Sequence, residues 1–167
     1  MKILRWVLPV VLVYGAFANG QSKVESFKGK MMPTFSATTF AGKKISNATL
    51  KGKPYILDFW ATWCGPCKAA SPTMQSIHKK YSGKGLVVIG ADVLESPTGV
   101  AEAKKYPSQH GYTYTFTSNN DKLGLKLGVE NIPCFIFVDK TGKIVAVRTG
   151  FVSTSPADFE SLVKGML

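Results

Sequence analysis

Two of the three cysteines in the chain, Cys64 and Cys67, lie in the stretch "DFWATWCGPCK". Their C-x-x-C spacing is compatible with metal binding, a structural staple or dithiol–disulfide exchange. A disulfide across two residues closes a very short loop, so it would add little as a staple. A structural zinc site needs four ligands, and the remaining candidates, Cys134, His78 and His110, are not paired at ligand spacing. We therefore expect no metal site, and disulfide exchange is the favoured chemistry.

The residues around the pair suit a redox role. Cys64 follows an apolar segment that reads as a strand and precedes a segment that reads as a helix. Free backbone N–H groups and the helix dipole at a helix N-terminus stabilise a thiolate, which is the species that attacks disulfides. Cys67 comes one helical turn later, where it can form a disulfide with Cys64 and release a substrate thiol. Gly65 and Pro66 let this turn form and preorganise the helix start.

Asp58 is an acid inside the apolar run, six residues before Cys64. Burial of a carboxyl in such a strand should raise its pKa. We expect Asp58 to accept the proton of Cys67 and so make that thiol nucleophilic. A structural hydrogen-bonding role, or an exposed position at a sheet edge, is the alternative.

The first 18 residues have the pattern of a secretory signal peptide. Lys2 and Arg5 precede an apolar stretch of 13 residues, 6–18, which ends in an A-x-A cleavage pattern. A membrane-spanning helix needs roughly 20 apolar residues, so this stretch is short for a permanent anchor. We expect export, to the periplasm in a bacterium. An uncleaved N-terminal membrane anchor is the alternative.

Length and composition favour one globular domain. The chain has 167 residues, of which 45% are hydrophobic. We assign residues 31–167 to this domain and expect the polar residues 19–30 to be flexible. The net charge is +11, but the lysines are scattered and no arginine–aromatic pattern marks a nucleic-acid groove. Nucleic-acid binding is therefore not expected, and we expect a monomer.

The pattern along the chain predicts an α/β fold whose sheet is covered by helices on both faces. The expected elements are a β-hairpin at 33–46, a buried strand at 54–61, a helix at 65–81, a buried strand at 85–93, a helix at 98–111 interrupted or ended near Pro107, a strand at 112–117, a helix at 121–129, a hairpin at 134–150 and a closing helix at 155–167.

The motif "LDFWATWCGPCKAASP" resembles the signature of the thioredoxin superfamily, and "NIPCFIFVD" resembles the loop that carries its cis-proline. The segment "MPTFSATTFAGKKISNATLKGKPYILDFWATWCGPC" is similar to secreted proteins of the TlpA/ResA type, and so is the central insertion before "GVENIP". The resemblance covers residues 31–165. It implies a thioredoxin-like fold with a central mixed sheet, an N-terminal β-hairpin and an inserted helix and strand.

The resemblance also implies roles for single residues. Cys64 corresponds to the exposed nucleophile, Cys67 to the buried resolving cysteine and Asp58 to the buried acid. Together they form the expected catalytic set, and the two cysteines form the expected redox-active disulfide. The expected substrate-binding residues are Trp63, Gly65, Pro66, Ile132 and Pro133.

The chain departs from the family pattern at two places. Cys134 follows Pro133 where the family usually has threonine, and the acid that the family has in the helix is missing from "KAASP". A buried cysteine is most often a packed small hydrophobe, although Cys134 could instead form an alternative disulfide or modulate the redox pair. The missing acid leaves proton handling more dependent on Asp58.

We therefore expect an exported reductase of protein disulfides that uses no cofactor. The Gly-Pro dipeptide between the cysteines resembles thioredoxin, whose potential is about −270 mV. The resemblance implies disulfide-containing protein substrates, a membrane protein that donates electrons, and a possible role in cytochrome c maturation. A thiol-dependent peroxidase is one alternative, although Ala61 stands where peroxiredoxins have threonine. A non-enzymatic peptide-binding module is the other.

Overall fold

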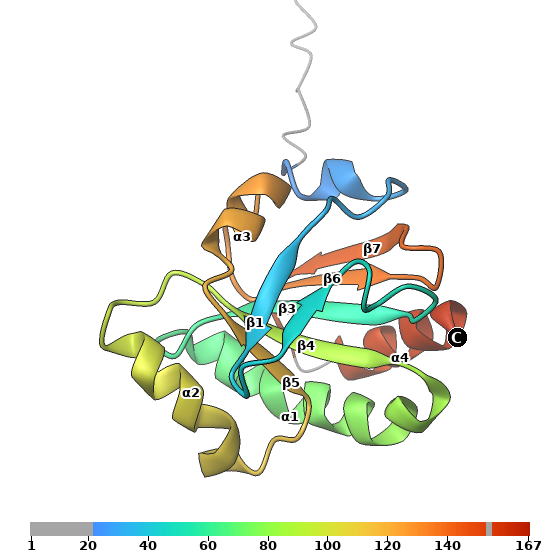
Figure 1. The fold of residues 1–167 in the computed structure, drawn as a ribbon. Coiled ribbons are helices and arrows are strands. Elements are labelled where there is room, and N and C mark those ends of the chain that lie inside the picture. The colour runs from blue at the N-terminus through green and yellow to red at the C-terminus, as the bar shows by residue number, and fades with distance from the viewer. Residues whose placement is uncertain (1–21, 153–154) are drawn as a thin grey trace, which may run out of the picture.

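The computed structural model describes residues 22–152 and 155–167, so the expected signal peptide lies outside the described residues. The elements are η1 (Glu25–Phe27), β1 (Ser36–Thr39), β2 (Lys44–Ser46), β3 (Tyr55–Trp60), α1 (Gly65–Tyr81), η2 (Ser82–Lys84), β4 (Val87–Asp92), α2 (Gly99–His110), β5 (Thr115–Ser118), α3 (Asp121–Leu127), β6 (Cys134–Val138), β7 (Ile144–Thr149) and α4 (Ser155–Met166). Figure 1 shows the strands joined in one sheet with the helices around it.

The sheet has seven strands in the order β2-β1-β5-β4-β3-β6-β7. Strands β3, β4 and β5 are parallel, and β6 runs antiparallel to both β3 and β7. The β1–β2 hairpin joins the sheet antiparallel to β5. The mixed sheet, the N-terminal hairpin and the inserted α2 and β5 confirm the predicted architecture.

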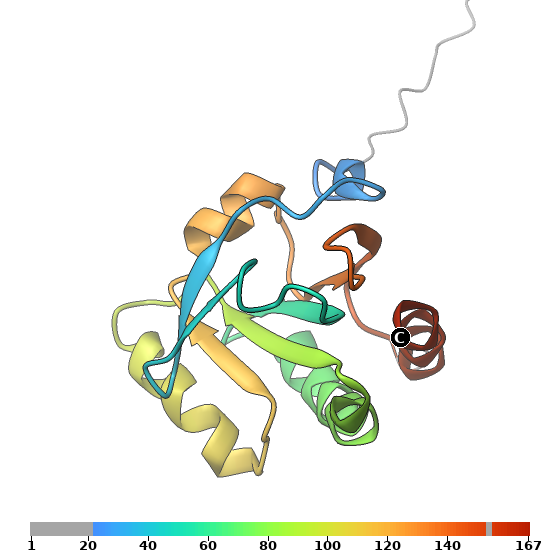
Figure 2. The same ribbon diagram turned by 45° about the vertical axis from the view of Figure 1, so that its right-hand side comes forward.

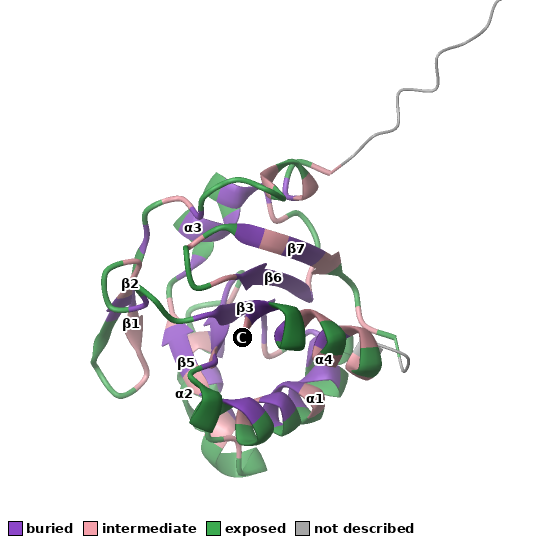
Figure 3. Ribbon diagram, turned by 90° about the vertical axis from the view of Figure 1, so that its right-hand side faces the viewer, coloured by how far each residue is buried: buried purple, intermediate pink, exposed green. Residues whose placement is uncertain are grey.

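Helices cover both faces of the sheet (Figure 2). Side chains of α1, α2 and α4 form one apolar cluster with Ile56 and Trp60 of β3. Side chains of α3 and the N-terminal segment form a second cluster with Leu57 and Phe59. This division follows from the alternation of side chains along a strand. Strands β3 and β6 are buried on both faces at the centre of the molecule (Figure 3).

Helix α2 corrects the prediction that the helix is interrupted or ends near Pro107. It continues to His110 and ends at Gly111, which adopts φ 69°. Proline in a helix removes one backbone hydrogen bond, but Pro107 lies in the last turn, where little helix remains to be disrupted. The left-handed conformation of Gly111 is a common way to end a helix.

The described part of the segment expected to be flexible at 19–30, residues 22–30, lies before the hairpin and contacts the sheet. Of these residues, Glu25–Phe27 form the turn η1, and Gly29 and Lys30 hydrogen-bond to the start of β7. The Gly29 N–H donates to the Ile144 carbonyl at 2.7 Å, and the Ile144 N–H donates to the Lys30 carbonyl at 2.8 Å. Val24 is buried in the second apolar cluster. Val24, the partly buried Phe27 and these backbone hydrogen bonds together dock the segment.

Within the described ranges, no helix has the length and apolar character needed to cross a membrane.

Candidate active site

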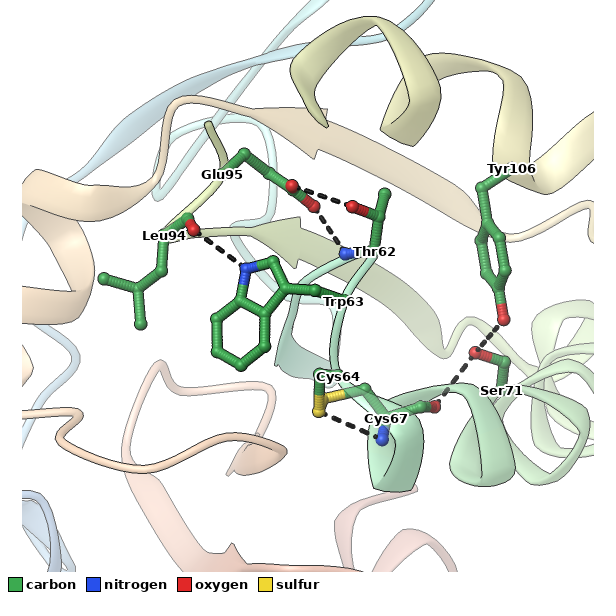
Figure 4. Close-up of a disulfide and its surroundings, with 8 residues drawn as sticks. All are labelled: Thr62, Trp63, Cys64, Cys67, Ser71, Leu94, Glu95 and Tyr106. Carbon is green, nitrogen blue, oxygen red and sulfur yellow. Dashed lines mark hydrogen bonds between the residues drawn. A yellow bond between two sulfur atoms is a disulfide. The ribbon is translucent and has the colours of Figure 1, made fainter. Parts of the chain in front are cut away.

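The two cysteines lie at the N-terminus of α1, as the sequence predicted. Cys64 is the N-cap residue of this helix, and its Sγ accepts a hydrogen bond from the Cys67 N–H at 3.2 Å. The two residues form a disulfide (Figure 4). Pro66 occupies the first turn of α1, where its missing N–H costs nothing. The helix terminus therefore offers N–H groups to a sulfur that becomes negatively charged on reduction.

Cys64 is less accessible than the family resemblance implied. In the disulfide form 4% of Cys64 and 1% of Cys67 is exposed, so the expectation of an exposed nucleophile needs correction. The disulfide and the Cys67 N–H hold the Cys64 side chain against the helix start. Gly65 and Pro66 next to it are exposed.

Asp58 lies in the middle of β3, between Gly90 of β4 and Phe135 of β6. It is 1% exposed, which excludes an exposed edge position, and its Oδ1 has no hydrogen-bond partner among the described residues. By strand alternation its side chain points to the same face as Ile56 and Trp60, the face covered by α1. Burial raises the pKa of the Asp58 carboxyl to about 8. The carboxyl can therefore both take up and release a proton near neutral pH.

The loop that leads to Cys64 is tied to the loop that follows β4 (Figure 4). The Glu95 carboxylate accepts hydrogen bonds from the Thr62 N–H at 2.5 Å and from the Thr62 hydroxyl at 2.8 Å. The Trp63 indole N–H donates to the Leu94 carbonyl at 3.0 Å. Trp63 remains 61% exposed, so its ring is available to a partner beside the disulfide.

Leu94 and Glu95 were missed by the sequence analysis. The sequence did contain a signal for the position of Glu95. This residue follows the buried strand β4, whose carboxyl end lies at the same sheet edge as that of the parallel strand β3. Leu94 has a positive φ of 57°, and the Asp121 carboxylate accepts a hydrogen bond from its N–H at 2.8 Å. These contacts fix the direction of the Leu94 carbonyl that holds Trp63.

The predicted cis-proline is confirmed: the Ile132–Pro133 peptide bond is cis. The Pro133 carbonyl accepts a hydrogen bond from the Gly150 N–H at 2.8 Å. Ile132 is partly exposed and packs against both apolar clusters, whereas Pro133 is buried. The loop that carries these residues is thus held by the end of β7.

Cys134 is fully buried at the start of β6, opposite Phe59 in the sheet register. It belongs to the apolar cluster on the α3 face, whereas Cys64 and Cys67 belong to the cluster on the α1 face. Burial raises the pKa of its thiol to about 12. The geometry therefore supports the interpretation of Cys134 as a packed small side chain.

The described part of the chain contains no group of three or more His, Cys, Asp or Glu side chains that could hold a metal ion.

A C-x-x-C disulfide at a helix N-terminus, in a fold shared with thiol:disulfide interchange proteins, defines the class: the chain is a thiol:disulfide oxidoreductase with a thioredoxin-like fold. It belongs to the AhpC/TSA family, whose model matches residues 28–147. It is 35% identical over 146 residues to the thiol-disulfide oxidoreductase ResA of Bacillus thuringiensis, which covers 87% of this chain and 81% of that protein.

Two solved structures show the same fold. A putative thiol:disulfide interchange protein DsbE from Chlorobium tepidum superposes with a TM-score of 0.75 at 28% identity, covering 83% of this chain and 96% of that one. The pneumococcal exposed lipoprotein thioredoxin Etrx1 from Streptococcus pneumoniae superposes with a TM-score of 0.66 at 28% identity, covering 79% and 99%.

Proposed function

We propose that this protein is an exported reductase of disulfides in other proteins. The single observation that carries the proposal is the Cys64–Cys67 pair at the N-terminus of α1, with Gly65 and Pro66 between the cysteines. A thiolate at this position is stabilised by backbone N–H groups, and its partner thiol lies close enough to resolve a mixed disulfide.

The reaction begins with the reduced dithiol. The Cys64 thiolate attacks a client disulfide, forms a mixed disulfide and releases the first client thiol. The carboxylate of Asp58 then accepts the proton of Cys67, whose thiolate attacks Cys64 and releases the second client thiol. The raised pKa of Asp58, about 8, suits this acceptor role near neutral pH. The protein is left with the Cys64–Cys67 disulfide.

The client lies against the surface around this disulfide. Trp63 offers an exposed ring, and Gly65 and Pro66 leave the helix start open. By the family resemblance, an extended client backbone docks on the loop of Ile132 and Pro133, of which Ile132 is partly exposed.

An exported reductase must receive electrons from outside its own compartment. We infer a membrane protein that passes thiol-derived electrons to Cys64–Cys67, in line with the signal-like residues 1–18. The name of one similar protein, the pneumococcal exposed lipoprotein thioredoxin, supports an exported location. Client cysteines of apocytochrome c, as in cytochrome c maturation, fit a reductase in this place.

Trapping tests the proposal. With Cys67→Ser, mixed disulfides on Cys64 should persist in cells and identify the client, while Cys64→Ser should trap nothing and lose insulin reduction. A redox titration should give a midpoint near the reducing end of the family, about −270 mV. A midpoint near about −120 mV would refute the reductase direction, and full insulin reduction by Cys64→Ser would favour a binding module instead.

A peroxidase is the weaker candidate. The position three residues before Cys64 is Ala61, which offers no hydroxyl to a peroxide. Cys134, the one cysteine outside the pair, is buried on the opposite face of the sheet. Hydroperoxide consumption by the reduced protein at a rate matching that of disulfide exchange would reverse this order of preference.

A further inference from the structure

The β4–α2 loop, residues 93–98, lies beside the turn that leads from β3 to the start of α1 (Figure 4). In that turn the Cys64 N–H donates to the Ala61 carbonyl at 3.1 Å, so Thr62 and Trp63 are its two central residues. Both central residues are held by hydrogen bonds to the loop. The two residues that precede Cys64 therefore depend on a segment 31 to 33 positions further along the chain.

Trp63 is tied to this loop through its indole N–H, which donates to the Leu94 carbonyl at 3.0 Å. This bond engages one edge of the ring, and most of the side chain remains exposed. Exposed side chains exchange rapidly between rotamers unless a contact selects one of them. The bond to Leu94 therefore selects one orientation of the Trp63 ring beside Cys64.

Leu94 has a backbone conformation that needs support. Its φ of 57° lies in the left-handed region, which is unfavourable for a residue with a side chain. Leu94 is 56% exposed, so burial of the side chain does not explain the conformation. The Asp121 carboxylate, at the start of α3, accepts a hydrogen bond from the Leu94 N–H at 2.8 Å. An unfavourable conformation that its surroundings maintain points to a functional use, and here it directs the Leu94 carbonyl at Trp63.

Glu95 holds the same loop against Thr62. Its carboxylate accepts hydrogen bonds from the Thr62 N–H at 2.5 Å and from the Thr62 hydroxyl at 2.8 Å. The carboxylate lies against Gly99, the first residue of α2, where a Cβ would overlap it. Glycine at position 99 therefore leaves the space in which Glu95 reaches Thr62.

A second pair of hydrogen bonds in the chain has the same arrangement. The Gln75 amide accepts a hydrogen bond from the Thr113 N–H at 2.8 Å and donates one to the Thr113 hydroxyl at 2.9 Å. Gln75 lies on α1 eight residues after Cys67, roughly 12 Å further along the helix. This pair shows that glutamine in place of Glu95 can keep both bonds to Thr62. It also supplies a control site away from the disulfide.

We propose that Leu94 and Glu95 are positioning residues for client binding. Through their bonds to Trp63 and Thr62 they hold the Trp63 ring in the orientation in which it contacts a protein client. The proposal rests on the proposed role of Trp63 as a client-contact residue. Leu94 and Glu95 act on the ring and leave the chemistry of the cysteines alone. Their loss should therefore slow exchange with a protein disulfide and spare exchange with a small disulfide that has no side chains to place on the ring.

Single-turnover kinetics with the reduced full chain tests the proposal. The protein is mixed with insulin or with bis(2-hydroxyethyl) disulfide, the reaction is stopped by alkylation, and mass spectrometry measures the oxidised Cys64–Cys67 pair. Glu95→Ala should lower the second-order rate constant for insulin by about fivefold to tenfold, the cost of one well-placed aromatic contact. The rate constant for the small disulfide should stay at the wild-type value, which also reports that the variant is folded.

The Trp63 indole reports the orientation of the ring directly. Its nitrogen–proton NMR resonance, assigned by its absence from Trp63→Phe, should move in Glu95→Ala toward the position of a free indole, and the proton should exchange faster with water. Gln75→Ala removes the equivalent pair of hydrogen bonds and should leave this resonance unchanged. An unchanged resonance in Glu95→Ala would overturn the proposal.

Matched variants separate positioning from general stability. Glu95→Gln should keep the wild-type rate constants with both substrates, because it can keep both hydrogen bonds. Gly99→Ala adds a Cβ where the carboxylate lies and should reproduce the loss specific to insulin with Glu95 still present. Gln75→Ala should change neither rate constant. Equal slowing of both substrates by Glu95→Ala, an insulin-specific loss in Gln75→Ala, or a loss in Glu95→Gln as large as in Glu95→Ala would overturn the positioning role.

Trp63→Ala distinguishes this proposal from the one on which it rests. If Trp63→Ala slows insulin selectively and Glu95→Ala does not, the positioning role fails and Trp63 remains a client-contact residue. If Trp63→Ala leaves the insulin rate constant unchanged, the client-contact role of Trp63 fails, and the positioning role fails with it.

Discussion

The replacement Asp58→Asn should change how the stability of the oxidised protein depends on pH. The substitution keeps the size of the side chain and removes its ionisation. In the folded protein the pKa of Asp58 is about 8, against an ordinary value of 3.8. Since the oxidised cysteines do not titrate, this carboxyl is the main group in its neighbourhood that responds to pH.

The sign follows from proton binding. Between pH 3.8 and about pH 8 the folded state keeps the proton on Asp58 while the unfolded state releases it. The stability contributed by the neutral carboxyl is therefore fully present below pH 3.8 and is lost as the pH rises through this window. Each pH unit is worth about 1.4 kcal/mol. The loss between pH 5 and 8 amounts to roughly 3–4 kcal/mol, a large part of the roughly 5–15 kcal/mol that keeps a domain folded.

Urea unfolding of both oxidised proteins at four pH values from about 5 to 8 measures the effect. The stability of Asp58→Asn relative to the wild type should rise by about 3–4 kcal/mol over this range. The carboxyl of Asp92, whose pKa is also raised, to about 6, is present in both proteins and cancels in the difference. Asp139→Asn is the control. Hydrogen bonds from the turn lower the pKa of this exposed acid, so its titration changes the stability only below pH 3.8. A flat difference between pH 5 and 8 would refute the raised pKa and with it the proposed acceptor role.

Three further substitutions test other parts of the structure. Glu95→Ala removes both hydrogen bonds to Thr62 and should lower the unfolding free energy by about 2 kcal/mol, measured by urea unfolding against the exposed Glu102→Ala. Gly90→Ala places a Cβ 2.7 Å from the Phe116 ring and should cost about 1–3 kcal/mol; an unchanged midpoint would contradict this packing. Cys134→Ala should leave the redox midpoint of the pair unchanged, and mass spectrometry of the air-oxidised wild type should find no bridge to Cys134.

The chemistry of the site was accessible from the sequence because it depends on local order. Cys64 and Cys67 are one helical turn apart, and a helix that begins at Gly65 places them at its N-terminus. The apolar run around Asp58 predicted burial, and the structure confirms it. Periodicity likewise predicted the sheet and the helices on both faces, although it misjudged where α2 ends.

Tertiary structure alone decided which distant residues hold the segments on either side of the redox pair. Glu95 is 33 positions from Thr62, and Tyr106 is 35 positions from Ser71. No periodicity links such pairs, because their contact depends on how the parallel strands β3 and β4 align and how α2 packs beside α1. The same register places Cys134 on the face opposite to Cys67. The sequence by itself thus determined the chemistry of the cysteine pair. The packing of the sheet and helices determined which side chains surround the pair and hold its loops, because side chains far apart in the chain meet only when the core is assembled.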